Sequence, residues 1–355
     1  MLEGIRILDL TKSLAGPVAT MILGELGADV IKIEPPEGDE TRYWAPIVDG
    51  ESVYFMSINR NKRSIVIDLK RDEGREIFYK LVERSDVVIE NFRPDVPQRL
   101  GIDYETLRKI NNKLIYCAVR GFGSSSPYRN KPSYDLLIQA MSGLMMTTGR
   151  ENDPPVRVAF ALFDIYTGMI AAITILASLI KRSVSGEGSY IEVSLYDTAI
   201  FSMSYIPMIY LVTGSRPKRL GHAHPSIVPY QAFETRDNKW IAVAVTNDRF
   251  WSNLCKALER EDLCRDPRYR SNPDRVANRE ELLKTLEEEF KKRSREEWLE
   301  ILEKHDVPAA PVYELDEVFR DPHVVKTELV VEIPHNKLGR VKQIRFPAYI
   351  NNERP

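Results

Sequence analysis

The sequence predicts an α/β protein made of two structural units. Three observations support this fold class. Apolar runs of strand length alternate with helical stretches over residues 5–119. The chain has 355 residues, which is more than one hydrophobic core usually supports. After residue 228 the alternation gives way to two strand patterns followed by helices, which is typical of a smaller α+β unit.

The first half has the order of elements expected of a mostly parallel sheet. Strand patterns cover residues 5–10, 29–33, 64–68, 86–90 and 114–119. Helix patterns cover residues 17–26, 72–84 and 104–110. The turn after the first strand, at residues 11–17, lacks the Gly-x-Gly-x-x-Gly spacing of dinucleotide-binding domains, and the chain has no Walker loop. An NAD-binding domain is therefore disfavoured.

These patterns divide the chain into a large and a small domain. We expect residues 1–215 to form most of a large α/β domain, with a linker rich in Gly, Pro, His and basic residues at 216–228. Residues 229–306 are expected to form the small α+β domain, with strands at 230–233 and 239–245 and helices at 248–258, 279–293 and 295–304. Residues 307–355 would be a linker and a return to the large domain.

Composition and charge restrict the class of protein. A formal net charge of −2 provides no general attraction to nucleic acid, so no nucleic-acid partner is expected. The three cysteines lack metal-ligand spacing and are too few for a disulfide framework, so we expect no metal site. The N-terminus carries no apolar signal-peptide region, and we expect a cytoplasmic protein.

The most informative stretch surrounds Asp164. Residues 156–163 have a strand-like pattern, Asp164 stands where a helix N-cap would, and residues 169–180 are almost wholly apolar. A helix that is apolar on all sides is a buried one, and its run is shorter than the ~20 residues that span a bilayer. We therefore expect a core helix and no membrane segment. Taken alone, Asp164 is more often a structural cap than a catalyst.

Motifs along nearly the whole chain change that interpretation. They are LEGIRILDLT at residues 2–11, LAGP at 14–17, GADVIKIE at 27–34, NRNKRS at 59–64, ENFRP at 90–94, RGFG at 120–123, QAMSG at 139–143 and PAAPV at 308–312. In this order and spacing the sequence closely resembles the class III CoA-transferases, a superfamily that includes formyl-CoA transferase, carnitine CoA-transferase and α-methylacyl-CoA racemase. The resemblance implies a Rossmann-like large domain built from both chain ends, a smaller domain, and an interlocked homodimer.

The resemblance also implies a mechanism. Asp164 would be the catalytic nucleophile that attacks an acyl-CoA, giving a mixed anhydride and then an aspartyl-CoA thioester, from which a carboxylic acid acceptor takes the CoA. Coenzyme A and acyl-CoA would be substrates, with no tightly bound cofactor. A mid-sized dicarboxylic or hydroxy acid is the expected acceptor. Backbone N–H groups of residues 121–123 or of the start of the Asp164 helix would stabilise the oxyanions.

Coenzyme A carries several phosphate charges and an adenine ring, so its site needs cations and a flat apolar surface. Arg60, Lys62 and Arg63 form a short basic cluster, and further arginines stand at strand or helix ends, where a sheet-edge crevice would gather them. A lone cation is more often a solvated surface residue, and the phenylalanines among the candidates can equally be core residues. With the resemblance, the expected CoA contacts are Ala15, Ile58, Asn59, Arg60, Asn61, Lys62, Asn91, Phe92, Arg93, Arg99, Arg120, Gly121, Phe122 and Tyr134.

Two alternatives compete with CoA transfer. An α-methylacyl-CoA racemase pairs Asp with a His in a Gly-His-Asp segment, but here the corresponding residues are Ser133-Tyr134-Asp135, and a phenol is a poor base at neutral pH. The other alternative is a CoA-binding protein without chemistry. Formyl and oxalyl specificity is disfavoured, because formyl-CoA transferases have Gln and Arg where this chain has Leu14 and Pro35.

Overall fold

The computed structural model describes residues 1–354, which form two compact units. Among the described residues, unit 1 comprises 1–145, 157–216 and 329–354, and unit 2 comprises 146–156 and 217–328. Unit 1 thus contains both ends of the chain. Compared with the expected small domain at 229–306, unit 2 also includes residues 146–156, which precede the Asp164 helix, residues 217–228 of the expected linker, and residues 307–328.

Unit 1 is built on a six-stranded sheet in which every neighbouring pair is parallel. Its order is β5-β2-β1-β6-β7-β9, so that Leu8 of β1 lies between Ile31 of β2 and Val88 of β6. Numbered within the sheet, this is 3-2-1-4-5-6, the order typical of Rossmann folds. The strands are β1 (Arg6–Asp9), β2 (Asp29–Glu34), β5 (Lys62–Val66), β6 (Val87–Glu90), β7 (Ile115–Arg120) and β9 (Ser189–Ser194).

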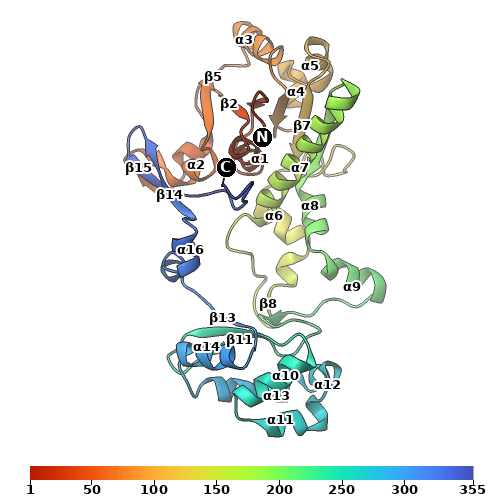
Figure 1. Ribbon diagram of the computed structural model, residues 1–355. Helices are drawn as coiled ribbons and strands as arrows, with labels where there is room; N and C mark the ends of the chain where they lie inside the picture. The colour runs from red at the N-terminus through yellow and green to blue at the C-terminus, as the bar shows by residue number, and fades with distance from the viewer. Residues whose placement is uncertain (355) are drawn as a thin grey trace. The chain divides into compact units, whose positions relative to one another are not determined.

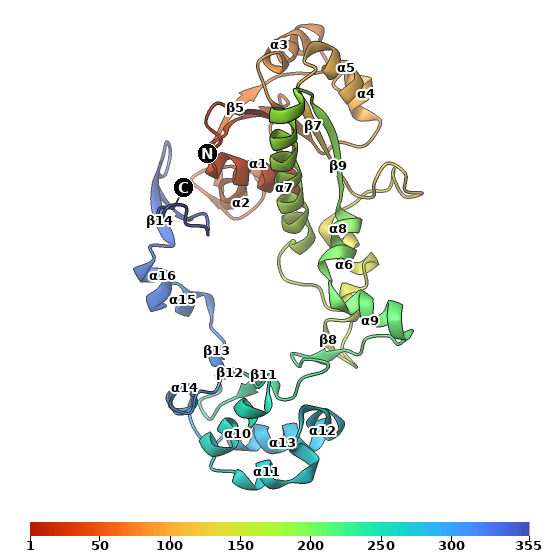
Figure 2. The same cartoon turned by 45° about the vertical axis from the view of Figure 1, so that its right-hand side comes forward.

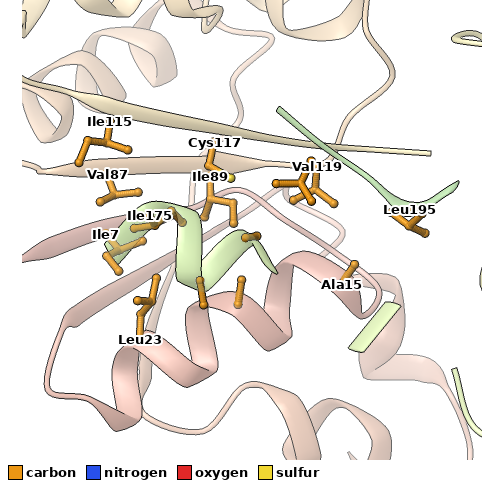
Figure 3. Packing of buried hydrophobic residues seen from close by; sticks show 14 of the residues in the cluster. Ile7, Ala15, Leu23, Val87, Ile89, Ile115, Cys117, Val119, Ile175 and Leu195 are labelled. Carbon is orange, nitrogen blue, oxygen red and sulfur yellow. The ribbon is translucent and has the colours of Figure 1, made fainter. Parts of the chain in front are cut away.

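Helices cover both faces of this sheet. On one face α1 (Ala15–Glu25) and α7 (Leu162–Ser185) pack against each other and against the strands (Figures 1 and 2). Figure 3 shows Leu23 of α1 and Ile175 of α7 beside Ile7, Val87 and Ile89 of the sheet. On the other face α3 (Asp72–Val82) and α5 (Tyr104–Ile110) bury Phe78, Val82 and Leu107. The predicted alternation of strands and helices is therefore confirmed.

The remaining elements of unit 1 are short. They are η1 (Glu40–Tyr43), β3 (Ile47–Val48), β4 (Glu51–Ser52), α2 (Val53–Ile58), α4 (Val96–Leu100), α6 (Asp135–Met141), α8 (Leu195–Ser202), α9 (Tyr205–Thr213), β14 (Val330–His335) and β15 (Gly339–Ile344). A further 3-10 turn at Leu144–Met146 leads out of the unit.

Helix α7 is less buried than its sequence predicts. It spans 24 residues and buries Phe163, Ala171 and Ile175, but Ile173 is 58% exposed and Val184 is 88% exposed. By length and mean hydropathy, α7 would suffice for a membrane span, as would the bent pair α8 and α9. Core helices pass the same test, and α7 packs on the sheet of unit 1. The expectation of burial on all sides is wrong for the single chain, because one apolar side of α7 faces outward.

Unit 2 combines antiparallel strands with helices. Strands β11 (Tyr230–Glu234), β12 (Trp240–Ala244) and β13 (Ala309–Pro311) form one sheet, and β8 (Gly149–Arg150) pairs with β10 (Leu220–Gly221). Its helices are α10 (Asp248–Ala257), α11 (Glu261–Arg265), η3 (Pro267–Tyr269), α12 (Asn272–Ala277), α13 (Arg279–Phe290), α14 (Arg295–Lys304), α15 (Leu315–Val318) and α16 (Pro322–Lys326).

One disulfide links two helices of unit 2. Cys255 of α10 is bonded to Cys264 of α11, whereas Cys117 of the large sheet is a buried free thiol. The sequence predicted no disulfide framework, and a single bond does not make one, but this pair was not anticipated. Two cysteines nine residues apart in sequence carry no signal of their pairing without the helix–helix packing that brings them together.

Candidate active site

Asp164 lies in the first turn of α7 but does not cap it. The N-cap residue is Ala161, which makes Asp164 the third residue of the helix. Instead, Asp135 of α6 accepts a hydrogen bond from the backbone N–H of Phe163 at 2.8 Å. The prediction of Asp164 as an N-cap is therefore wrong, because a carboxylate from another helix satisfies the helix start. The Asp164 side chain stays available to the space in front of the helix.

The segment before α7 is not the strand that its apolar pattern predicted. Residues 154–161 form no helix or strand. They are held by side chains, since the Val158 N–H donates to Oε1 of Gln139 at 2.8 Å and Gln139 donates to Asp135 at 2.5 Å. Thus α6 fixes both the approach to α7 and its first turn, and with them the backbone that carries Asp164.

The environment of Asp164 disfavours its charged form. Burial, and secondarily the neighbouring carboxylate of Asp135, raise the pKa of Asp164 to about 7. At neutral pH a substantial fraction is therefore ionised, yet the carboxylate is far more basic than an ordinary aspartate. Strongly perturbed carboxylates of this kind cluster at functional sites.

Asp164 borders a cavity of about 430 Å³ at the reversal point of the strand order, between β1 and β6. The loops that follow these two strands form much of its wall, as expected for a ligand crevice at the carboxyl ends of parallel strands. Asn91 joins the loops, accepting from the Lys12 N–H at 3.0 Å and donating to the Lys12 carbonyl at 2.8 Å. The lining residues include Lys12, Ser13, Leu14, Ala15, Glu40, Asn91, Phe92, Arg93, Arg120, Gly121, Arg129, Lys131, Ser133, Tyr134, Asp164 and Leu195.

Half of the expected CoA contacts meet in this cavity. They are Ala15, Asn91, Phe92, Arg93, Arg120, Gly121 and Tyr134. Arg120 differs from the other cations, because its guanidinium is buried and donates to both oxygens of Glu90, at 2.9 and 2.5 Å. Most of its charge is thus neutralised within the protein, and it also donates to the Phe92 carbonyl at 3.1 Å. With these bonds, Arg120 can hold the loop after β6 in place.

Three lining cations were missed by the sequence reasoning. All three stand on loops, Lys12 alone and Arg129 and Lys131 only two residues apart. No local pattern marks such residues as ligand contacts, because one or two cations on a loop are usually solvated side chains. The RGFG motif at residues 120–123 pointed to the nearby strand end but not to the loop that follows it.

The other expected contacts lie outside this cavity. Ile58 belongs to a small apolar cluster, and Phe122 is packed in the core between Tyr128 and Tyr196. Arg60 and Asn61 both donate to Glu25, at 2.6 and 3.0 Å. Asn59 and the side chain of Lys62 are buried, and the Lys62 ammonium donates to Asn59 at 2.9 Å. The NRNK motif is thus engaged in contacts within the protein.

Comparison with known proteins decides the family. The family model "CoA-transferase family III" matches residues 2–355. The chain is 41% identical to human succinyl-CoA:glutarate CoA-transferase, with 96% of this chain and 78% of that protein aligned. It is 40% identical to succinate–glutarate CoA-transferase of Agrobacterium fabrum (99% and 89%) and 39% identical to acetyl-CoA:oxalate CoA-transferase of Acetobacter aceti (93% and 85%). This chain belongs to the CoA-transferase family III.

Solved structures agree with this family. A CAIB/BAIF family protein from Brucella suis is 39% identical with a TM-score of 0.88, covering 99% of this chain and 93% of that one. A hypothetical protein from Mycobacterium tuberculosis is 29% identical with a TM-score of 0.89, covering 100% and 94%. The predicted α/β class and the enzyme class, a CoA-transferase of class III, are thereby confirmed. A family III enzyme uses CoA thioesters and carboxylates as substrates.

A second cavity of this CoA-transferase adjoins the first. It measures about 490 Å³ and shares Lys12, Phe92 and Val96 with the Asp164 cavity. Its wall is more apolar, with Ile33, Ile67 and Leu100, and its cations include Lys70, Arg75 and Arg99. The expected contact Arg99 therefore lines this space instead of the first. Among residues 1–354 no cluster of His, Cys, Asp and Glu has the arrangement of a metal site.

Proposed function

We propose that this protein is an acyl-CoA:carboxylate CoA-transferase that works through a covalent intermediate on Asp164. The observation that supports it most directly is the Asp164 carboxyl group at the wall of a cavity rimmed by Lys12, Arg93, Arg129 and Lys131. A carboxylate nucleophile and cations for an anionic cosubstrate are the two parts that CoA transfer requires.

The transfer would proceed in two halves. The Asp164 carboxylate attacks the acyl carbonyl carbon of the donor, the C–S bond breaks, and CoA thiolate leaves a mixed anhydride. The thiolate then attacks the aspartyl carbonyl, which releases the donor acid and gives an Asp164–CoA thioester. The acceptor carboxylate reverses these steps and leaves as the new acyl-CoA, restoring Asp164. Each step exchanges one activated acyl derivative for another, so no step expends a large free energy.

The raised pKa of Asp164 suits this role. A more basic carboxylate is a stronger nucleophile, and a pKa of about 7 still leaves about half of it ionised at neutral pH. Oxyanions formed in each half need nearby N–H donors. The Phe163 N–H is occupied by Asp135, which weakens the case for the α7 start and leaves Gly121, in the cavity wall, as the better candidate.

Two adjoining cavities suit the length of coenzyme A. We place the adenine group in the second cavity, between apolar Ile33, Ile67 and Leu100, and the reactive thioester beside Asp164 in the first. The shared wall of Lys12 and Phe92 would then lie along the diphosphate and pantetheine. In this arrangement the cations of both cavities neutralise the phosphates. The acceptor would be a mid-sized dicarboxylic or hydroxy acid, as the names of the relatives succinate–glutarate CoA-transferase and succinyl-CoA:mesaconate CoA-transferase suggest.

The active form would be a cytoplasmic homodimer, interlocked as the family resemblance implies. The outward side of α7 supports a partner, because Met169, Ile173, Ile180 and Val184 recur at helical spacing and are exposed. Phe201 of α8 and Leu211 of α9 add further exposed apolar surface. Monomeric proteins seldom leave so much contiguous apolar surface in water.

The experiment that tests this proposal is trapping of the acyl enzyme. The protein is incubated with succinyl-CoA, glutaryl-CoA and other acyl-CoAs, quenched with hydroxylamine, and digested for mass spectrometry. Hydroxamate on the peptide containing Asp164 is expected with the wild type and absent in Asp164→Asn. CoA binding without any hydroxamate would refute covalent transfer and favour binding without chemistry. α-Proton exchange on 2-methylacyl-CoA would favour racemisation, although no histidine lines the cavity among the described residues.

A further inference from the structure

The buried side of the NRNK motif is an ion-pair network beneath the loop at residues 10–14. Lys62, at the start of β5, has a side chain only 2% exposed, and Asp9, at the end of β1, is fully buried. The Lys62 ammonium lies 3.0 Å from Asp9 Oδ2. Buried charges are costly unless they are paired and hydrogen-bonded, so losing any partner of Lys62 or Asp9 would destabilise this region.

The three donors of Lys62 reach three different elements. Its Nζ donates to Asp9 of β1 at 3.0 Å, to the Pro17 carbonyl in the first turn of α1 at 3.0 Å, and to the Asn59 side chain after α2 at 2.9 Å. An ammonium group has three donors, and all are used. Lys62 therefore joins the strand before the loop to the helix after it.

Both ends of the loop are held by the same network. Asp9 accepts from the Thr11 N–H at 2.9 Å and from the Thr11 and Thr20 hydroxyls at 2.5 and 2.7 Å. The Thr11 carbonyl accepts from buried Lys32 at 2.8 Å. Gly16 packs so closely on Thr11 that a Cβ at Gly16 would lie 2.3 Å from its side chain. These contacts thus hold the two ends of the loop close together.

The loop carries strain and forms the wall of both cavities. Ser13 has a φ of 65°, a left-handed conformation that is unfavourable for a serine and persists only where surrounding contacts impose it. Lys12, Ser13 and Leu14 line the Asp164 cavity, and Leu10, Thr11 and Lys12 line the second one. A loop that relaxed from this conformation would change the shape of both spaces.

We infer that Lys62 is a positioning residue, which holds the loop at residues 10–14 in its strained conformation so that the two cavities accept acyl-CoA. Asp9 and Asn59 act with it. Lys62 does not touch the substrate, which differs from the direct CoA contact that its basic character suggested. This inference rests on the proposed function only for the identity of the ligand, since the effect on the loop is a property of the protein alone.

The test compares Lys62→Met with Arg182→Met. Methionine keeps the length and apolar stem of Lys62 but removes its ammonium. Arg182 also forms an ion pair in unit 1, with Asp86 at 2.8 Å, but it lies at the far end of α7 from Asp164. Asn59→Ala, which removes one acceptor, serves as a milder second variant if Lys62→Met does not fold.

Hydrogen exchange and CoA affinity are measured on each variant without turnover. In Lys62→Met we expect faster exchange at residues 10–16 and CoA binding at least tenfold weaker, and in an active enzyme a matching rise in KM for acyl-CoA with a smaller change in kcat. Arg182→Met should change neither exchange at residues 10–16 nor CoA affinity. Asn59→Ala should show the same changes as Lys62→Met in weaker form.

Equal effects of Lys62→Met and Arg182→Met would overturn the inference, because general destabilisation would explain both. Unchanged exchange at residues 10–16 in Lys62→Met would overturn it as well. Failure of the proposed function would look different, since the wild type would then show no transfer with any donor whereas the exchange difference would remain.

Discussion

Replacing Asp164 by Asn tests the electrostatic description of the site through stability instead of catalysis. Asn has nearly the same shape but does not ionise. Burial and the nearby Asp135 charge raise the pKa of Asp164, so the ionised carboxylate is less stable in the folded protein than in the unfolded chain. We expect Asp164→Asn to abolish transfer and to stabilise the protein at alkaline pH.

The size and sign of the effect follow from linkage. Between pH 3.8 and about 7 the folded protein holds a proton on Asp164 that the unfolded chain releases, so wild-type stability falls relative to the variant as pH rises through this window. A full shift from 3.8 to about 7 costs about 4 kcal/mol at pH 8 and about 1.7 kcal/mol at pH 5. Asp164 is partly exposed and therefore screened, so we expect the advantage of the variant to grow by about 2 kcal/mol between these pH values.

Urea unfolding of both proteins at half-unit steps from pH 4.5 to 8.5 measures this difference. The control is Glu105→Gln, which removes an exposed carboxylate of α5 and measures the effect of losing a surface charge of the same kind. A difference for Asp164→Asn that stays constant between pH 5 and 8 would refute the raised pKa. A difference that grows in the opposite direction would show that the ionised form is stabilised by contacts within unit 1.

Three further predictions follow from named contacts. If Asp164 is the nucleophile, as we propose, it must be ionised, so kcat/KM should rise with pH and level off above about 7. Asp135→Asn should move this inflection to lower pH by removing a repelling charge, and an inflection that stays in place would contradict the role of Asp135. Reducing the Cys255–Cys264 bond, which closes a loop of nine residues, should lower the unfolding free energy of unit 2 by about 2–3 kcal/mol. If all three thiols can be alkylated in denatured protein that has not been reduced, the bond is absent and this prediction is wrong. If the outward side of α7 is a subunit interface, Ile173→Glu should convert a dimer to a monomer in light scattering, whereas a wild-type monomer would count against the interface.

The parallel sheet was predictable because its signals are local. Buried parallel strands read as short apolar runs and amphipathic helices separate them, so β1, β2, β6, β7 and their helices were found within a few residues. The helix α5 has the predicted bounds, since Asp103 caps it and Asn111 follows it. Here local propensity and tertiary packing agree.

The sequence reasoning was wrong where a partner lies far away along the chain. Residues 156–163 have the pattern of a strand, but their backbone bonds to Gln139 and Asp135 instead of a neighbouring strand. A distant partner also explains why Asp164 is not the N-cap of α7, because Asp135 of α6 accepts from the Phe163 N–H at the helix start. Lys62 was expected to contact CoA, because its partner Asp9 stands 53 residues earlier and no local pattern indicates their ion pair. Charge pairing across such separations leaves no mark in a single sequence without related sequences to compare.

The two carboxylates at the start of α7 have different roles, one in holding the helix and one in the proposed chemistry. Asp135 has both of its oxygens engaged, one by the Phe163 N–H and one by Gln139, so it is held in place and acts as a fixed negative charge. No described hydrogen-bond donor engages Asp164 in the same way, so nothing offsets the burial and the Asp135 charge that raise its pKa. If Asp164 had capped α7 itself, as its position suggested, the helix N–H groups would have stabilised its charge and weakened it as a nucleophile. Supplying the cap from α6 leaves the carboxylate of Asp164 basic and exposed to the cavity.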